Sequence, residues 1–105
     1  MNRVFYAEQP DKVGYVDGLA IYRWDIQKEE SGYSCLEVSF AGAVTREKVT
    51  EKVIEAVYGH GYEQKILNDF NAAAAGILSP EYKQPYLDFL NDRKTLKAEI
   101  HEAIQ

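Results

Sequence analysis

Few side chains in this sequence have the type and spacing that catalysis or metal binding requires. His60 lies between two glycines, and Glu63 follows three residues later, so the pair could supply a loop base or two metal ligands. A structural zinc site needs four ligands, and one histidine–acid pair is far short of that set. The simpler interpretation of His60 is a solvated loop histidine.

Two further reactive side chains have no partner in the sequence. Cys35 falls on the polar face of its predicted strand, without the neighbouring base or helix N-terminus that would activate a thiol. We therefore expect an inert cysteine, and a single cysteine also fits a reducing compartment. His101 lies near the end of the last predicted helix, where a cation interacts favourably with the helix dipole.

Motifs with a defined chemistry are missing. The sequence has no glycine-rich phosphate loop, no supported Ser/His/Asp arrangement and no Cys/His spacing of a metal site. We therefore expect no enzyme activity, no cofactor and no metal. The net charge of −5 is spread so that no third of the chain is basic, and we expect no nucleic-acid partner.

The bulk composition is that of a folded domain. The 105 residues are 46% hydrophobic and 28% charged, which predicts one folded domain. The residue patterns described below predict that it is mostly β over residues 1–44 and helical over residues 45–105. No apolar run approaches the roughly 18 residues of a membrane span, and the quickly acidic N-terminus does not resemble a secretory signal. We expect a cytoplasmic protein with no membrane partner.

A β-hairpin is the firmest element of the N-terminal part. Apolar and polar residues alternate along residues 19–28 and 33–41, so each strand has one apolar face. For these faces to coincide, a three-residue loop is needed at residues 30–32. The predicted cross-strand pairs are Ile26–Leu36, Trp24–Val38 and Tyr22–Phe40. Residues 3–7 and 14–16 have strand composition and could extend the sheet.

Three helical segments follow. Thr45 is a suitable N-cap for a helix over residues 46–58, which the glycines at 59 and 61 end. A second helical pattern runs from residue 62 to 74, with Gly76 just beyond it. Pro85 lies too deep for the first turn after Ser79, so we expect a short turn at residues 80–84 and a helix from about Gln84.

The last helix carries the longest apolar pattern, in steps of four and three residues from Tyr82 to Ala103. Arg93 interrupts this seam, and its guanidinium must either extend to solvent or pair with a carboxylate of another element or chain. A second line lies beside the seam. The predicted interaction surface consists of Leu90, Arg93, Lys97 and Ile104.

Tyrosine is unusually frequent, with eight residues in the chain. Tyr58, Tyr62, Tyr82 and Tyr86 are predicted to line one core between helices, with their hydroxyls at its rim. The alternative is a surface for partners, since tyrosine suits half-buried contact surfaces.

These elements predict an α+β fold, an antiparallel sheet of two to four strands covered by three C-terminal helices, the last one long. Along these elements the chain carries, in order, Tyr22-Arg23-Trp24-Asp25-Ile26, Leu36-Glu37-Val38, Val53-Ile54, residues 66–72, Gly76-Ile77-Leu78 and residues 82–89. This order resembles that of small uncharacterised proteins of gut-bacterial phages and prophages, over about residues 19–100. The resemblance implies no defined activity, but it implies an accessory or assembly role, and this chain departs from the pattern at residues 59–61.

Two classes of function follow. The first is a non-enzymatic interaction or assembly module, binding a protein partner or a second copy through the last helix. The alternative is a small enzyme or ligand-binding domain, with Tyr58, His60 and Tyr62 at the mouth of a pocket. A third hypothesis is a regulator that binds an acidic or basic partner protein.

Overall fold

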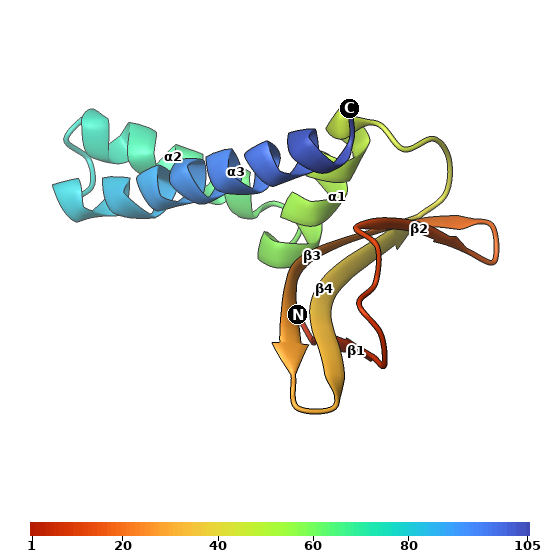
Figure 1. Ribbon diagram of the computed structural model, residues 1–105. Coiled ribbons are helices and arrows are strands. Elements are labelled where there is room, and N and C mark those ends of the chain that lie inside the picture. Colours follow the sequence, from red (N-terminus) through yellow and green to blue (C-terminus); the bar gives the residue numbers. More distant parts are fainter.

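The computed structural model describes all 105 residues and contains one four-stranded antiparallel sheet followed by three helices (Figure 1). The predicted α+β fold class is confirmed. The strands are β1 (Val4–Tyr6), β2 (Val13–Val16), β3 (Leu19–Glu29) and β4 (Gly32–Phe40), in the sheet order β1-β4-β3-β2. The helical elements are α1 (Arg46–Tyr58), α2 (Tyr62–Ala74), a short 3-10 turn at Pro80–Lys83, and α3 (Gln84–Ala103).

The register of the β3–β4 hairpin differs from the prediction. Next to the turn Glu29 pairs with Gly32, so the loop has two residues rather than three. An irregularity between Trp24 and Gln27 then shifts the register by one residue, and Asp25 within it has φ 52°. The prediction required the two apolar faces to coincide. The β-bulge achieves this in place of the predicted three-residue loop. The resulting pairs are Trp24–Leu36, Tyr22–Val38 and Ala20–Phe40, so the predicted pairs are wrong by two residues.

The polar face of the sheet is itself covered. Because β1 and β2 lie on opposite edges, residues 7–12 must cross the sheet between them. The crossing segment accepts two hydrogen bonds from Arg23, at the carbonyls of Asp11 (2.9 Å) and Lys12 (2.7 Å). Arg23 also donates to Glu37 at 3.1 Å and is only 7% exposed. Its charge is thus paired in a site that the sequence pattern alone predicts to be solvated.

Cys35 lies on this covered face, opposite Val4 of β1, and is fully buried. Burial raises the pKa of the Cys35 thiol above its ordinary value, and the negative charge of Glu37 acts in the same direction. The thiol therefore stays protonated at neutral pH. This agrees with the predicted inert cysteine, although the side chain is buried rather than at a polar surface.

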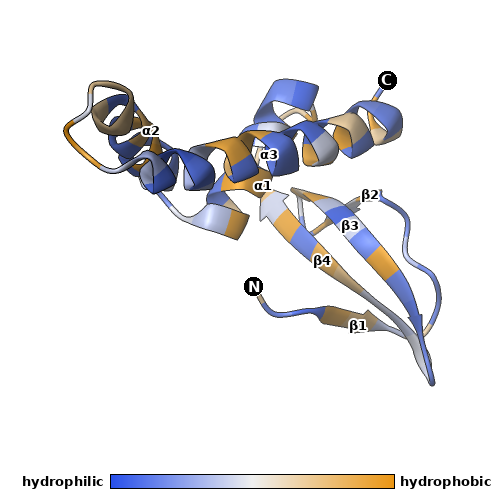
Figure 2. Cartoon of the chain, turned by 90° about the vertical axis from the view of Figure 1, so that its left-hand side faces the viewer, coloured by the Kyte–Doolittle hydropathy of each residue, from blue (hydrophilic) through white to orange (hydrophobic).

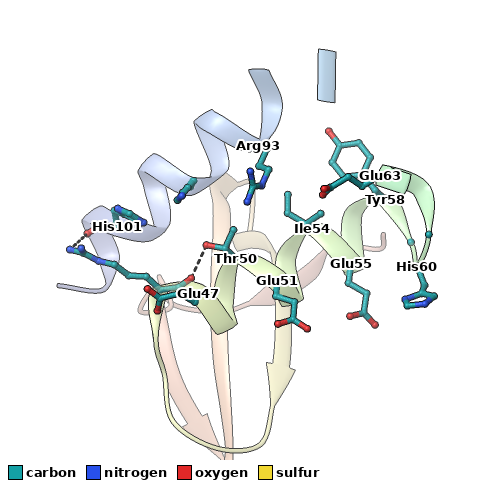
Figure 3. Close-up of a pocket in the computed structure, with 14 residues that line it drawn as sticks. Glu47, Thr50, Glu51, Ile54, Glu55, Tyr58, His60, Glu63, Arg93 and His101 are labelled. Atoms are coloured by element: carbon teal, nitrogen blue, oxygen red, sulfur yellow. Dashed lines mark hydrogen bonds between the residues drawn. The ribbon is translucent and has the colours of Figure 1, made fainter. Parts of the chain in front are cut away.

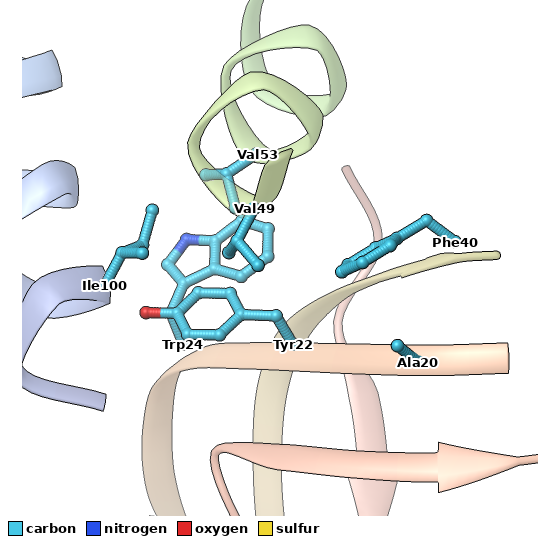
Figure 4. Close-up of a cluster of buried hydrophobic side chains, with 7 residues drawn as sticks. All are labelled: Ala20, Tyr22, Trp24, Phe40, Val49, Val53 and Ile100. Atoms are coloured by element: carbon cyan, nitrogen blue, oxygen red, sulfur yellow. The ribbon is translucent and has the colours of Figure 1, made fainter. Parts of the chain in front are cut away.

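The main hydrophobic core lies between the other face of the sheet, α1 and the C-terminal half of α3 (Figure 4). The strand pattern explains its position. Apolar and polar residues alternate along β3 and β4 (Figure 2), so the apolar side chains of each strand share one face. We name it the sheet core. Its buried members are Ala20, Tyr22, Trp24, Phe40, Val49, Val53 and Ile100.

A second cluster lies farther along the helices, where α2 packs against the N-terminal half of α3 and the turn before it. Phe89 is at its centre, 2% exposed, with its ring 5.0 Å from Tyr58 and 6.4 Å from Tyr86. Tyr62 stacks on Tyr58 at 5.2 Å. We name this part the helical arm. Three of the four tyrosines predicted to share an interhelical core therefore do so, whereas Tyr82 is 44% exposed.

The arm makes the molecule elongated, with extents of 52 × 33 × 21 Å. The radius of gyration is 16.6 Å, whereas a compact domain of this length has about 13 Å. The helix boundaries agree with the predictions. Thr45 accepts a hydrogen bond from the Lys48 amide as N-cap, Gly76 follows the C-cap of α2 with φ 80°, and α3 begins at Gln84.

Candidate functional site

A groove of about 530 Å³ lies between α1 and α3 (Figure 3). Fourteen residues line it, and only two of them are hydrophobic. The groove continues past the end of α1 to the Gly59-His60-Gly61 turn and Glu63 at the start of α2. It therefore joins the predicted surface on α3 with the loop proposed for the pocket mouth.

Two interactions hold α1 and α3 antiparallel on either side of the groove. At one end the Arg46 guanidinium donates to the carbonyls of Ile104 (2.6 Å) and His101 (3.3 Å). These carbonyls belong to the last turn of α3 and have no partner within the helix, so an arginine satisfies them well. At the other end the Tyr58 hydroxyl donates to Asp92. The two contacts fix which residues of α1 lie opposite which residues of α3.

Charge is arranged in two rows along this groove. Glutamates recur every four residues on α1, and basic side chains recur every four residues on α3, so each set lies along one line of its helix. The antiparallel packing places the rows side by side. We name them the acidic row (Glu47, Glu51, Glu55) and the basic row (Arg93, Lys97, His101).

The two rows are not paired with each other. The three ion pairs of the chain join Arg3 to Asp25, Arg23 to Glu37 and Lys65 to Asp69, all outside the groove. Figure 3 shows the reason: Glu51 and Glu55 extend away from α3, whereas Arg93 extends towards Thr50 and Ile54. Glu47, Glu51, Glu55 and Lys97 are exposed and Arg93 is half-exposed, so a molecule of complementary charge could contact both rows.

Tyr58 anchors the arm end of the groove. Burial raises the pKa of its phenol above the ordinary value, and the hydrogen bond to the Asp92 carboxylate raises it further. The hydroxyl is therefore a protonated donor at neutral pH. Its ring stacks on the ring of Tyr62 and meets the ring of Phe89 edge to face, which fixes its position.

The predicted site residues separate into two groups. Arg93 and Lys97 line the groove, and Leu90 is 39% exposed two turns before Lys97 on the same line of α3. Ile104 instead packs against the sheet core. Of the three residues predicted at a pocket mouth, Tyr58 and His60 line the groove, whereas Tyr62 belongs to the aromatic cluster.

The acidic row was not predicted from the sequence. Its signal is present, since Glu47, Glu51 and Glu55 are spaced by four within the predicted helix 46–58. His101 was predicted to act on the helix dipole, and the structure also places it at the end of the basic row.

Two further findings concern metals and membranes. The chain brings together no group of three or more His, Cys, Asp or Glu side chains arranged to hold a metal ion. None of the helices combines the length and the apolar character that crossing a bilayer requires.

Comparison of the chain with protein-family models, with curated proteins and with solved structures gives no match. The resemblance to small phage-encoded proteins over residues 19–100 therefore stays a prediction. The chemistry and geometry of the groove are the basis for the function considered next.

Proposed function

We propose that this protein is a non-enzymatic interaction module that binds a protein partner through the groove between α1 and α3. The observation that carries the proposal is that two rows of opposite charge lie on adjacent helices and form no ion pairs with each other. A partner with matching rows would contact both at once, and such complementarity provides specificity and orientation more than affinity.

The repeat of glutamates along the acidic row is unfavourable to α1 itself. Like charges four residues apart destabilise a helix by about 0.2–0.5 kcal/mol per pair. The acidic row contains two such pairs, Glu47–Glu51 and Glu51–Glu55, and the ion pairs of the chain do not offset them. A partner that places positive charge against this row would remove the repulsion.

The lining of the groove favours a protein surface over a small ligand. Its volume of about 530 Å³ lies within the range of ligand pockets. Such pockets are lined mainly by hydrophobic and aromatic side chains, whereas twelve of the fourteen residues here are neither hydrophobic nor aromatic. Exposed charged side chains of this kind occur in the polar, solvent-accessible rim of protein interfaces.

A helical probe peptide tests the proposal. The probe is an alanine-based helix carrying one row of glutamates and one row of lysines, each with a spacing of four residues. Added to the ¹⁵N-labelled protein, it should shift the amide resonances of α1 and of residues 93–101, and the shifts should shrink as salt increases.

The control peptide has the same composition with its charges scrambled, so that neither row exists. It should bind at least about tenfold more weakly, which corresponds to roughly 1.4 kcal/mol. Equal binding of both peptides, or shifts located outside the groove, would contradict the proposal.

A second candidate is a small-ligand site at the arm end of the groove. It is favoured by Tyr58, His60 and Glu63, which all line this end of the groove. NMR titration of the His60 imidazole, with and without small zwitterionic solutes, tests this candidate. A His60 that titrates identically in every solution would eliminate it.

A further inference from the structure

We propose that the partner of the groove is a second copy of this chain, related by a two-fold axis that runs along the groove. This inference rests on the proposed function, because it identifies the protein that the groove binds. It follows from the order of charges on one face of the molecule, which is complementary to itself.

The register of the rows is fixed by the contacts at both ends of the groove. Arg46 reaches the carbonyl of His101, and Tyr58 reaches Asp92, so α1 and α3 run antiparallel with residue numbers that add to about 150. Glu51 therefore lies level with Lys97, and Glu55 level with Arg93. Glu47 lies level with His101 by the same relation.

A half-turn about an axis along the groove keeps the position of each residue along the groove and exchanges the α1 side with the α3 side. The basic row of the second copy then lies over the acidic row of the first, and the reverse holds for the other two rows. A half-turn about the axis across the groove, in the plane of the face, would instead oppose glutamate with glutamate. The charges therefore select one of the two face-to-face arrangements.

The contacts in the selected arrangement can be stated by residue. Glu51 of each copy faces Lys97 of the other, and Glu55 faces Arg93 of the other. Because the interface is isologous, each of these contacts occurs twice. Leu90, 39% exposed on the same line of α3 as Lys97, adds an apolar side chain beside the basic row of each copy.

The dimer should be weak and reversible. The contact face consists of two helices and is rich in charge, which places it among the small transient interfaces rather than the permanent ones. Each copy also carries a net charge of −5, which opposes association over longer distances. We expect a dissociation constant in the micromolar to millimolar range. The dissociation constant should rise when added salt screens the charges of the two rows.

Charge reversal provides the test, by sedimentation equilibrium up to millimolar concentration. Glu51→Lys and Lys97→Glu each oppose like charges at both symmetry-related contacts, so each variant alone should dimerise at least about tenfold more weakly than the natural chain. An equimolar mixture should recover the dimer, because every contact then joins a lysine to a glutamate. The double variant Glu51→Lys/Lys97→Glu should also dimerise.

The matched controls are Glu30→Lys and Lys28→Glu in the β3–β4 hairpin, where both side chains are exposed and far from the groove along the structure. They change the net charge by the same amounts and should leave dimerisation close to that of the natural chain. Amide spectra of all variants establish that they are folded.

Three results would overturn the inference: a natural chain that is monomeric at millimolar concentration, single variants that dimerise normally, or a mixture that stays monomeric. The proposed function fails separately. A monomeric chain whose groove amides still shift with the helical probe retains the interaction surface and loses only the second copy as its partner.

Discussion

The sheet core and the helical arm are built from different contacts. The sheet core combines aliphatic side chains of α1 and α3 with aromatic residues of the β3–β4 hairpin, so it joins elements that are distant in the sequence. The arm is formed by helices that follow one another in the chain, and aromatic rings fill most of its interior. The two regions thus differ in both chemistry and sequence separation.

The helix α3 connects the two regions. Its N-terminal half supplies Phe89 to the arm, and its C-terminal half supplies Ile100 to the sheet core. The groove lies where α3 passes from one region to the other, beside α1. A binding surface at this point depends on both hydrophobic clusters. A substitution in the sheet core and one in the arm should therefore affect this surface differently.

Trp24→Ala should produce the largest loss of stability, because the indole is 6% exposed at the centre of the sheet core. Removing a buried tryptophan costs about 3–5 kcal/mol of the free energy of unfolding, which is a large part of the total for a small domain. Denaturant unfolding followed by circular dichroism measures the change. A loss below about 1 kcal/mol would show that this face is not the main core.

Phe89→Ala should cost about 3 kcal/mol, and its effect should be confined to the arm. Native-state hydrogen exchange separates the two regions. We expect faster exchange of α2 amides, while β3 and β4 amides keep most of their protection. Equal acceleration in the sheet would instead show that core and arm unfold as one cooperative unit.

Alkaline pH should weaken the sheet core through Tyr22. Burial raises the pKa of Tyr22 from 10.0 to about 12, and the charge of Glu99 contributes to the shift. The phenol ionises more readily in the unfolded chain, so stability is fully present below pH 10 and falls as the pH rises to about 12. Two pKa units correspond to about 2.7 kcal/mol.

The check is to compare unfolding at about pH 9 and pH 12 for the natural chain and for Tyr22→Phe. The variant should lose less stability over this interval. Tyr58, whose pKa is raised in the same direction, keeps part of the dependence in both proteins. Identical pH dependence of the two proteins would mean that Tyr22 does not titrate in this range.

Tyr58→Phe should have the smallest effect, about 1 kcal/mol, because it removes one exposed hydrogen bond to Asp92 and leaves the aromatic stack in place. Thermal unfolding measures it. The matched variant Asp92→Asn keeps an acceptor and should cost less. If Tyr58→Phe costs as much as Phe89→Ala, the hydrogen bond rather than the ring cluster holds the arm to α1.

The helix boundaries were predictable because local chemistry sets them. Thr45 caps α1, the glycines at 59 and 61 end it, and Pro85 can occupy only the first turn of α3. Each of these signals acts within a few residues. The sequence contains all the information that they require.

The sheet was predictable in class but not in register. A bulge at Asp25 shifts the pairing of β3, and this aspartate is held at positive φ by contacts with a distant residue. The Arg3 guanidinium donates to its side chain at 2.8 Å and to its carbonyl at 2.6 Å. Parity of the alternating pattern predicts which faces meet, but it cannot predict an extra residue that a tertiary contact stabilises.

The candidate site was half predictable. Periodicity along α3 identified Arg93 and Lys97, since an arginine in an apolar seam is conspicuous. The acidic row lies on a helix whose neighbours across the groove are 38 to 54 residues away in the chain. Only the packing of α1 against α3 shows that the two rows share one face.

The path of residues 7–12 across the sheet has a consequence for the order of folding. Strands β1 and β2 each pair with a strand of the later hairpin, at opposite edges, and the crossing segment closes over Arg23. Neither strand can join the sheet before the strand that it pairs with has formed. We expect residues 1–16 to fold last and to unfold first, which makes them the part of the sheet most open to proteolysis.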